Sequence, residues 1–316
     1  MNVVVLVAAG LVALVSFAPL VRHEAWWIRS WDFPRLQILV TSVVVLVAYV
    51  LIWDVGTWPE VVTLGTLAVA LLLQAYRILP FTPLWPKQVL TATPGTEAPS
   101  LSIIVANVLM SNRQADRLVA IVRDRDPDLV LTLEPDDWWE RELRVLEDEY
   151  PHTIKAPLDN RYGMLLHSRL ELVEPEVKHL ISDEFPSMHL RVRLASGDEV
   201  WLHCLHPEPP SPTEADESTR RDAELLIIGD EVKDRDEPTV VAGDLNDVAW
   251  SYTTTLFQKI SGLLDPRKGR GMFNTFHAEH ALLRWPLDHV FHSDHFTVGE
   301  MVRLPAFGSD HFPVYA

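Results

Sequence analysis

Residues 239–246 read Thr-Val-Val-Ala-Gly-Asp-Leu-Asn, an apolar β-rich run that ends in the polar side chains of Asp244 and Asn246. Such a run is typical of a buried strand. At the end of one strand, a polar residue is most often a turn former or a helix cap. When several strands end in polar residues, the pattern instead indicates a binding or active site. The reason is that side chains from separate strand ends converge at one edge of a sheet.

Polar side chains also follow the other apolar runs. Asn107 follows Ser-Ile-Ile-Val-Ala, Glu134 follows Leu-Val-Leu-Thr-Leu, and His206 follows Val-Trp-Leu-His-Cys-Leu. Asp288 lies beside Val-Phe in a further run. This accumulation of carboxylates, an amide and an imidazole predicts one site, formed where these strands end at a common edge.

The pattern after Pro99 alternates short β-rich runs with longer amphipathic segments. The predicted strands are Leu101–Ala106, Leu129–Leu133, Gly163–His167, His189–Leu194, Val200–Leu205, Thr239–Ala242 and Leu287–His292. The predicted helices are Asp116–Arg125, Asp137–Glu149, Thr213–Lys233 and Tyr252–Ile260. Strands outnumber helices, and a hairpin is expected to turn at residues 195–198. This favours a mixed sheet or two packed sheets with helices outside over a purely parallel, doubly wound fold.

The residue types at the strand ends favour a hard metal ion. Carboxylate and amide oxygens suit Mg²⁺ or Mn²⁺, whereas zinc prefers closely spaced His or Cys. His277 and His280 are three residues apart, not the four of a helical zinc motif. The single cysteine, Cys204, excludes an internal disulfide and a cysteine-rich zinc cage, and we expect it to be a buried apolar residue.

A series of short motifs, in this order along the chain, resembles the endonuclease/exonuclease/phosphatase family. They are Asn107-Val108-Leu109, Leu133-Glu134, Arg161-Tyr162-Gly163-Met164 with Ser168-Arg169, His206-Pro207 with Pro209-Pro210, Gly243-Asp244-Leu245-Asn246, Leu287-Asp288-His289 and Ser309-Asp310-His311. The stretch 270–313 further resembles a bacterial branch that carries membrane helices before the catalytic domain. The resemblance covers nearly all of residues 100–316, and it implies an α+β fold, a four-layer α/β sandwich of two packed mixed sheets flanked by helices.

The family resemblance implies a metal site. By this resemblance Glu134 binds Mg²⁺ (or Mn²⁺), with help from Asn107 and Asp310 at neighbouring strand ends. The implied activity is metal-dependent hydrolysis of a phosphoric ester.

The resemblance also implies roles for five catalytic side chains. Asp244 and Asn246 orient the attacking water and bind the scissile phosphate, with Asp244 as general base. His311 contacts a phosphate oxygen, and Asp288 holds its other ring nitrogen. His206 binds phosphate or protonates the leaving oxygen. A carboxylate next to His311 is expected to raise the imidazole pKa and keep the ring protonated.

The first 79 residues predict a membrane region. Three apolar runs, at about 2–21, 36–53 and 61–78, each approach the ~20 residues that cross a hydrocarbon core. The first run lacks the positive flank and the cleavage site of a signal peptide. Aromatic residues that favour the headgroup zone stand at the run ends: Trp26, Trp27, Trp31, Trp53, Trp58, Tyr76 and Trp85. The Pro-rich residues 80–99 predict a linker that lifts the 100–316 domain off the membrane.

Lys and Arg in the short loops predict the orientation. Arg22, Arg29 and Arg35 lie between the first and second runs, none lies between the second and third, and Arg77 and Lys87 follow the third. The positive-inside rule then predicts a multi-pass protein of the cell membrane with its catalytic domain in the cytoplasm.

Charge bears on the substrate. Residues 1–91 carry five Lys/Arg and four Asp/Glu, so the remaining 22 basic and 40 acidic side chains give a formal charge of −18. Nucleic-acid affinity comes largely from basic residues, so the acidic charge disfavours a nuclease. The predicted membrane tether makes a lipid-linked phosphate attractive, because the anchor confines the domain near that substrate. A membrane-tethered nuclease stays open as the second substrate class. A catalytically silent membrane scaffold is a third reading, although every expected site residue is present. The sequence leaves the oligomeric state open.

Overall fold

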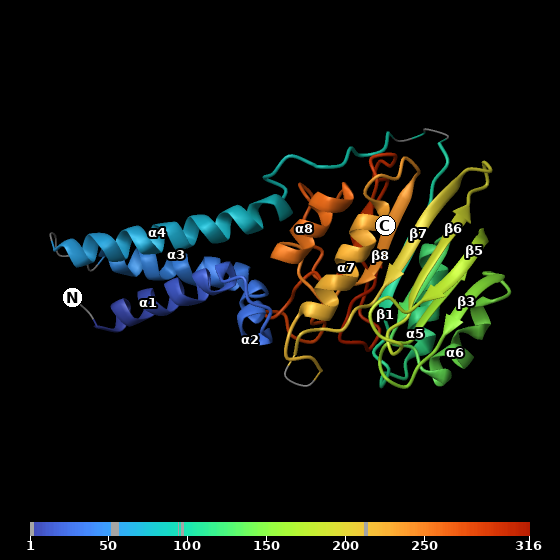
Figure 1. The fold of residues 1–316 in the computed structure, drawn as a ribbon, viewed down its shortest axis with the longest axis horizontal. Coiled ribbons are helices and arrows are strands. Elements are labelled where there is room, and N and C mark those ends of the chain that lie inside the picture. Colours follow the sequence, from blue (N-terminus) through green and yellow to red (C-terminus); the bar gives the residue numbers. More distant parts are fainter. Residues whose placement is uncertain (1–2, 52–56, 94, 96–97, 212–213) are drawn as a thin grey trace.

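The structure is a computed structural model that describes residues 3–51, 57–93, 95, 98–211 and 214–316. It consists of an N-terminal group of helices that projects from one end of a sandwich of two sheets (Figure 1). The C-terminal part of the chain lies within the sandwich.

The N-terminal helices run side by side. They are α1 (Val3–Phe17), α3 (Arg35–Leu51) and α4 (Trp58–Ile78), with the short α2 (Trp26–Arg29) between the first two. Within the described residues, Val3–Leu20 and Trp58–Phe81 are long and apolar enough to cross a membrane. The third predicted span differs, because α3 has 17 residues and qualifies only together with Trp26–Asp32, from which it is bent by 70°. The end of that run, residues 52–53, lies outside the described residues.

The rest of the described chain is built around two mixed sheets. The first has the order β10 (Val302–Arg303), β11 (Val314–Tyr315), β1 (Ile103–Asn107), β2 (Leu129–Leu133), β4 (Met164–Ser168), β3 (His152–Ala156). The second has the order β5 (Glu171–Lys178), β6 (Ser187–Arg193), β7 (Glu199–Leu205), β8 (Thr239–Asp244), β9 (Asp288–His292). In each sheet one central pair is parallel, β1 with β2 and β7 with β8, and the other pairs are antiparallel.

The central strands are buried on both faces. On β1, Ile103 and Val105 face the core between the sheets, whereas Ile104 and Ala106 pack against α5 (Ala115–Arg125) and α6 (Asp137–Leu143). Helices α7 (Thr219–Val232) and α8 (Tyr252–Ser261) cover the outer face of the second sheet in the same way. Burial on both faces explains why these strands read as continuous apolar runs. The expectation of two packed mixed sheets with helices outside is confirmed.

The sequence missed four strands and misplaced two helices. Strands β3, β5, β10 and β11 were not predicted, and the 137–149 helix is α6 followed by a short 3₁₀ turn, Arg144–Leu146. Helix α7 begins at Thr219; the predicted start, Thr213, lies outside the described residues. Just before α7 the backbone instead bonds to the N-terminal region, where Trp26 N donates to Asp216 O at 2.9 Å and Ser218 N donates to Glu24 O at 2.9 Å.

The Pro-rich segment lies along the sandwich. Gly269 N donates to Pro80 O at 2.8 Å, and Gln88 N donates to Lys268 O at 3.3 Å. Further on, Ala92 N donates to Val298 O at 2.8 Å. The described part of this segment is thus packed on the domain and does not hold it away from the helices, as a free spacer would.

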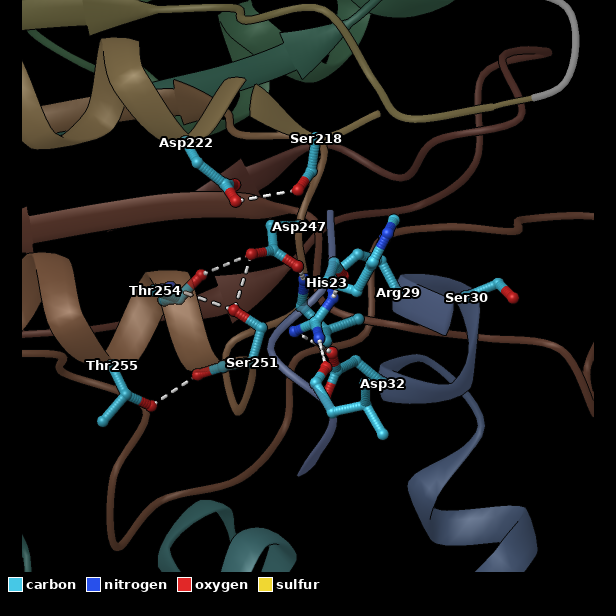
Figure 2. Close-up of polar contacts among 12 residues, drawn as sticks. His23, Arg29, Ser30, Asp32, Ser218, Asp222, Asp247, Ser251, Thr254 and Thr255 are labelled. Atoms are coloured by element: carbon cyan, nitrogen blue, oxygen red, sulfur yellow. Dashed lines mark hydrogen bonds and ion pairs between the residues drawn. The ribbon is translucent and has the colours of Figure 1, made fainter. Parts of the chain in front are cut away.

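Residues 18–34, which we call the connector, join α1 to α3 and dock on the sandwich. The indole Nε1 of Trp250 donates to Asp32 O at 2.8 Å. Figure 2 shows the connector beside a polar cluster in which Ser251 Oγ donates to Asp247 Oδ2 at 2.6 Å. The connector therefore reaches the loop that follows β8 and its Asp244.

Candidate active site

A cavity of about 350 Å³ opens at the carboxyl ends of the central strands. Its lining includes six of the eight predicted site residues: Glu134, His206, Asp244, Asn246, Asp310 and His311. The other two, Asn107 and Asp288, are each 1% exposed and lie directly behind the lining, in hydrogen bonds to it. The structure brings all eight together.

Asp244 occupies the centre of the site at the end of β8. Its Oδ2 accepts from Asn107 Nδ2 at 3.1 Å, and its Oδ1 accepts from the Asn246 backbone N at 2.9 Å. The preceding Gly243 has φ +147°, and a Cβ there would lie 1.9 Å from Leu205 O. Only glycine fits this close approach of β8 to β7, which sets the direction in which Asp244 leaves the strand.

Glu134 leaves β2 beside Asn107, because β1 and β2 are parallel and end together. Its Oε1 accepts from Asn107 Nδ2 at 2.8 Å and lies 4.0 Å from His206 Nε2. Burial raises the pKa of this carboxyl, although His206 and the Asn107 bond both act to lower it. The carboxylate form of Glu134 therefore gains from a further positive charge in the cavity.

His311 lies between two carboxylates. Its Nδ1 is 2.8 Å from Asp288 Oδ2, and its Nε2 is 3.6 Å from Asp244 Oδ2. Burial alone would lower the pKa of His311, but the charges of Asp288 and Asp244 outweigh it and raise the pKa to about 10. The ring is thus an imidazolium at neutral pH, as expected from a carboxylate next to it.

His206 completes the set from the end of β7. Its Nδ1 lies 3.2 Å from the Asp244 carbonyl oxygen, which leaves Nε2 on the side of Glu134. The ring of Tyr162 lies 5.5 Å from that of His206. One nitrogen of His206 is therefore held by backbone, and the other is directed toward the cavity.

A family model for the endonuclease/exonuclease/phosphatase family matches residues 104–311. The chain belongs to this family. Membership makes it a metal-dependent hydrolase of phosphoric ester bonds, and the resemblance in the sequence is confirmed. Among curated protein sequences, none matches this chain.

Solved structures of the endonuclease/exonuclease/phosphatase family share this fold at low sequence identity. D. rerio TDP2, complexed with single-strand DNA product, is 18% identical with a TM-score of 0.56, and the match covers 68% of this chain and 97% of that one. A family protein from Beutenbergia cavernae is 19% identical with a TM-score of 0.56, over 69% and 71% of the two chains. A family protein from Bacteroides vulgatus is 17% identical with a TM-score of 0.54, over 68% and 97%. These likenesses show the fold.

The carboxylates of Glu134 and Asp310 fit the divalent cation of the endonuclease/exonuclease/phosphatase family. Both line the cavity, and a cation there would offset the burial that disfavours the charged form of Glu134. Asp244, Asp288 and His311 also have ligand atoms within 4.8 Å of one another. Both ring nitrogens of His311 already face carboxylates in that group, and Glu134 and Asp310 stay the predicted metal ligands.

Asn107 lies between two carboxylates of the site. Its Oδ1 accepts from Leu109 N at 3.0 Å, so the nitrogen of the amide faces the cavity. That nitrogen donates to both Glu134 and Asp244. Asn107 thus positions two carboxylates, and its role as a metal ligand stays a prediction.

Several contacts in and around the cavity had no signal in the sequence. Phe33 comes from the connector and packs edge-on against Trp285, with ring centroids 5.7 Å apart. The Tyr162 hydroxyl bonds to Glu214, and both side chains line the cavity. Ser309 Oγ, behind the lining, donates to Asn107 O at 2.8 Å and ties the end of the chain to β1. The motif around Tyr162 was noted, but the pairing of these residues arises from tertiary packing alone.

Proposed function

We propose that this protein is a membrane-anchored, Mg²⁺- or Mn²⁺-dependent phosphoesterase that acts on a phosphoester carried by a membrane lipid. The observation that carries the proposal is Phe33, which belongs to the connector between two apolar helices yet lines the same cavity as Asp244 and His311. An enzyme whose anchor forms part of its active-site wall is suited to a substrate that resides in the same membrane.

The geometry supports a hydrolysis in which Asp244 acts as general base. Asp244 would take a proton from a water molecule as the water oxygen bonds to phosphorus, while the Asn246 backbone holds the carboxylate in place. His311 would donate to a phosphate oxygen and neutralise charge as it develops. His206 would pass a proton to the leaving oxygen as the P–O bond breaks.

Glu134 and Asp310 would hold the divalent cation at the other side of the cavity, with Asn107 fixing the direction of Glu134. A bound cation supplies charge neutralisation on the phosphate. The chain's own residues supply orientation and proton transfer.

The orientation predicted from Lys and Arg places this site on the cytoplasmic side of the cell membrane. A reporter fused after Ala316 tests this placement. The side is wrong if the reporter is active only outside the cytoplasm.

A nuclease is the second candidate, because TDP2 of the same fold was solved with single-strand DNA product. The formal charge of −17 for the whole chain weighs against it, since nucleic-acid binding relies on basic residues. A silent scaffold is less well supported, because all eight site residues are present and hydrogen bonds join several of them.

The full chain in lipid nanodiscs tests the proposal. We expect it to hydrolyse bis(p-nitrophenyl) phosphate and phosphatidylglycerol only with Mg²⁺ or Mn²⁺. Asp244→Ala and His311→Ala should each lower turnover about 10²–10³-fold, the cost of losing one group that stabilises the transition state. Asp294→Ala, at an exposed carboxylate, is the matched control and should retain full activity. Activity that survives in Asp244→Ala would refute the assignment, and faster cleavage of DNA than of lipid would establish the nuclease.

A further inference from the structure

Residues 276–285 form a hairpin that connects the active site to the N-terminal helices. At its base, Phe276 N donates to Trp285 O at 3.0 Å, and His277 N donates to Leu283 O at 3.1 Å. The base contacts the site directly, since Ala278 N donates to Asp310 O at 2.7 Å and the Phe276 ring lies 5.0 Å from the His311 ring. We refer to residues 276–285 as the 276–285 hairpin.

The tip of the hairpin exposes two leucines, which follow the exposed polar residues Glu279 and His280. Leu282 is 84% exposed and Leu283 is 49% exposed. A single exposed leucine is unremarkable on a soluble protein. Here, however, the Leu282 carbonyl accepts from Gln37 Nε2 at 2.7 Å, and Gln37 lies in the first turn of α3.

This contact places the tip beside an apolar helix surface. Along α3, the outward valines Val40, Val43 and Val44 are 45–61% exposed. At 1.5 Å per residue, Val40 lies only about 4.5 Å beyond Gln37 along the helix axis. If α3 is embedded, the two leucines are at the depth where the hydrocarbon begins.

Aromatic rings lead from this level to the imidazole. Phe33 contacts Trp285 with centroids 5.7 Å apart, and Trp285 stacks on Phe276 at 6.1 Å. Phe276 then contacts His311. Phe33, Phe276 and Leu287 also line the cavity. One wall of the active site is therefore apolar and continuous with the connector.

We propose that the 276–285 hairpin inserts Leu282 and Leu283 into the bilayer, and that Phe33, Trp285 and Phe276 form an apolar passage along which a lipid phosphoester reaches His311. The passage rests on the proposed function, because its substrate is the lipid phosphoester. The insertion of the two leucines does not depend on that function. The partner that covers the exposed leucines is the lipid bilayer, because they lie beside the exposed apolar surface of α3.

Insertion is tested without any measurement of hydrolysis. The native Cys204 is fully buried, so Leu282→Cys gives the full chain one accessible thiol for an environment-sensitive fluorophore. The control is Val145→Cys, 48% exposed, in the turn Arg144–Leu146 that directly follows α6. Helix α6 lies at the opposite end of the molecule from α3 in Figure 1. In nanodiscs of phosphatidylcholine and phosphatidylglycerol, we expect blue-shifted emission from position 282 that spin-labelled lipids quench, and neither effect at 145. Emission from position 282 that is water-like and unquenched would overturn the proposal.

The passage is tested by a split between two substrates. Leu282→Asp should lower hydrolysis of phosphatidylglycerol in the nanodisc about tenfold, because a buried leucine contributes roughly that factor to partitioning. It should leave hydrolysis of soluble bis(p-nitrophenyl) phosphate unchanged, and Val145→Asp should change neither rate. Equal losses on both substrates, or no loss on the lipid, would overturn the passage. A wild-type protein inactive on every phosphoester would refute the proposed function instead, and the quenching result would still decide insertion.

Discussion

Replacing Glu224 with glutamine is expected to remove a pH dependence from the stability of the protein. Glu224 lies on the buried face of α7, 3% exposed, and its Oε1 has no hydrogen-bond partner among the described residues. Burial raises the pKa of this carboxyl from 4.5 to about 7. The folded protein therefore holds a proton at Glu224 that the unfolded chain has already released.

The direction and size of the effect follow from this difference. Between pH 4.5 and about 7 the folded state binds more protons than the unfolded state, so stability falls as the pH rises. The contribution is fully present below 4.5 and is lost as the pH rises through 7. At about 1.4 kcal/mol per pKa unit, the total loss is about 3 kcal/mol. Glutamine cannot ionise, so the stability of the Glu224→Gln variant should not fall as the pH rises through 7.

Urea unfolding of the full chain in detergent, followed by tryptophan fluorescence, measures this difference. Relative to the wild type, the variant should gain about 2–3 kcal/mol in its free energy of unfolding between about pH 5 and pH 8.5. Any pH-independent cost of burying the amide cancels in that comparison. If the variant and the wild type differ by the same amount at both pH values, Glu224 is not buried as a neutral acid and the reasoning is wrong.

Four further outcomes are expected. Asp288→Asn removes the charge beside His311 Nδ1 and should lower kcat about 10–100-fold with little change in KM, which steady-state kinetics will show. Chelation with EDTA should abolish activity, and Mg²⁺ or Mn²⁺ should restore it; undiminished turnover after chelation would contradict the metal site. Gly243→Ala should lose about 3 kcal/mol of stability in urea, because its Cβ would collide with Leu205 O. Arg221→Met should lose about 3–5 kcal/mol, since Asp247 would be left as an unpaired buried charge; an unchanged urea midpoint would refute that pairing.

The central strands were predictable because packing on both faces demands an unbroken apolar run. Strand β2 has the bounds that the sequence predicted, and β7 and β9 differ by one residue at one end. The strands that the sequence did not predict are not packed on both faces in this way, so they lack an unbroken apolar run. Strand β5 is mostly exposed, contains Pro175 and has a register shift between Val173 and Glu176. Strands β10 and β11 have two residues each, which is too short for any periodicity.

The candidate site was predictable as a set of residues but not as a geometry. Strand ends and the family motifs named the eight side chains, and the contact between Asp288 and His311 follows the resemblance. The sequence could not say which atom of the Asn107 amide faces the cavity, because the backbone N of Leu109 decides that. It could not place Phe33 either, because that residue reaches the cavity only through the docking of the connector.

The hydrogen bond from Trp250 to Asp32 joins two parts of the chain that are 218 residues apart, and Phe33 next to it lines the cavity. Anchors are often exchangeable in evolution and in the laboratory, since a tether needs only to hold its cargo near a surface. The N-terminal helices, which we propose as the anchor, are not a tether in that sense. A chimera that carries another protein's helices, or a truncated form without them, would keep the catalytic side chains but have a wider mouth to its active site. We therefore expect the helices and the hydrolase to have diverged together as one unit, with substitutions in the connector compensated around Trp250.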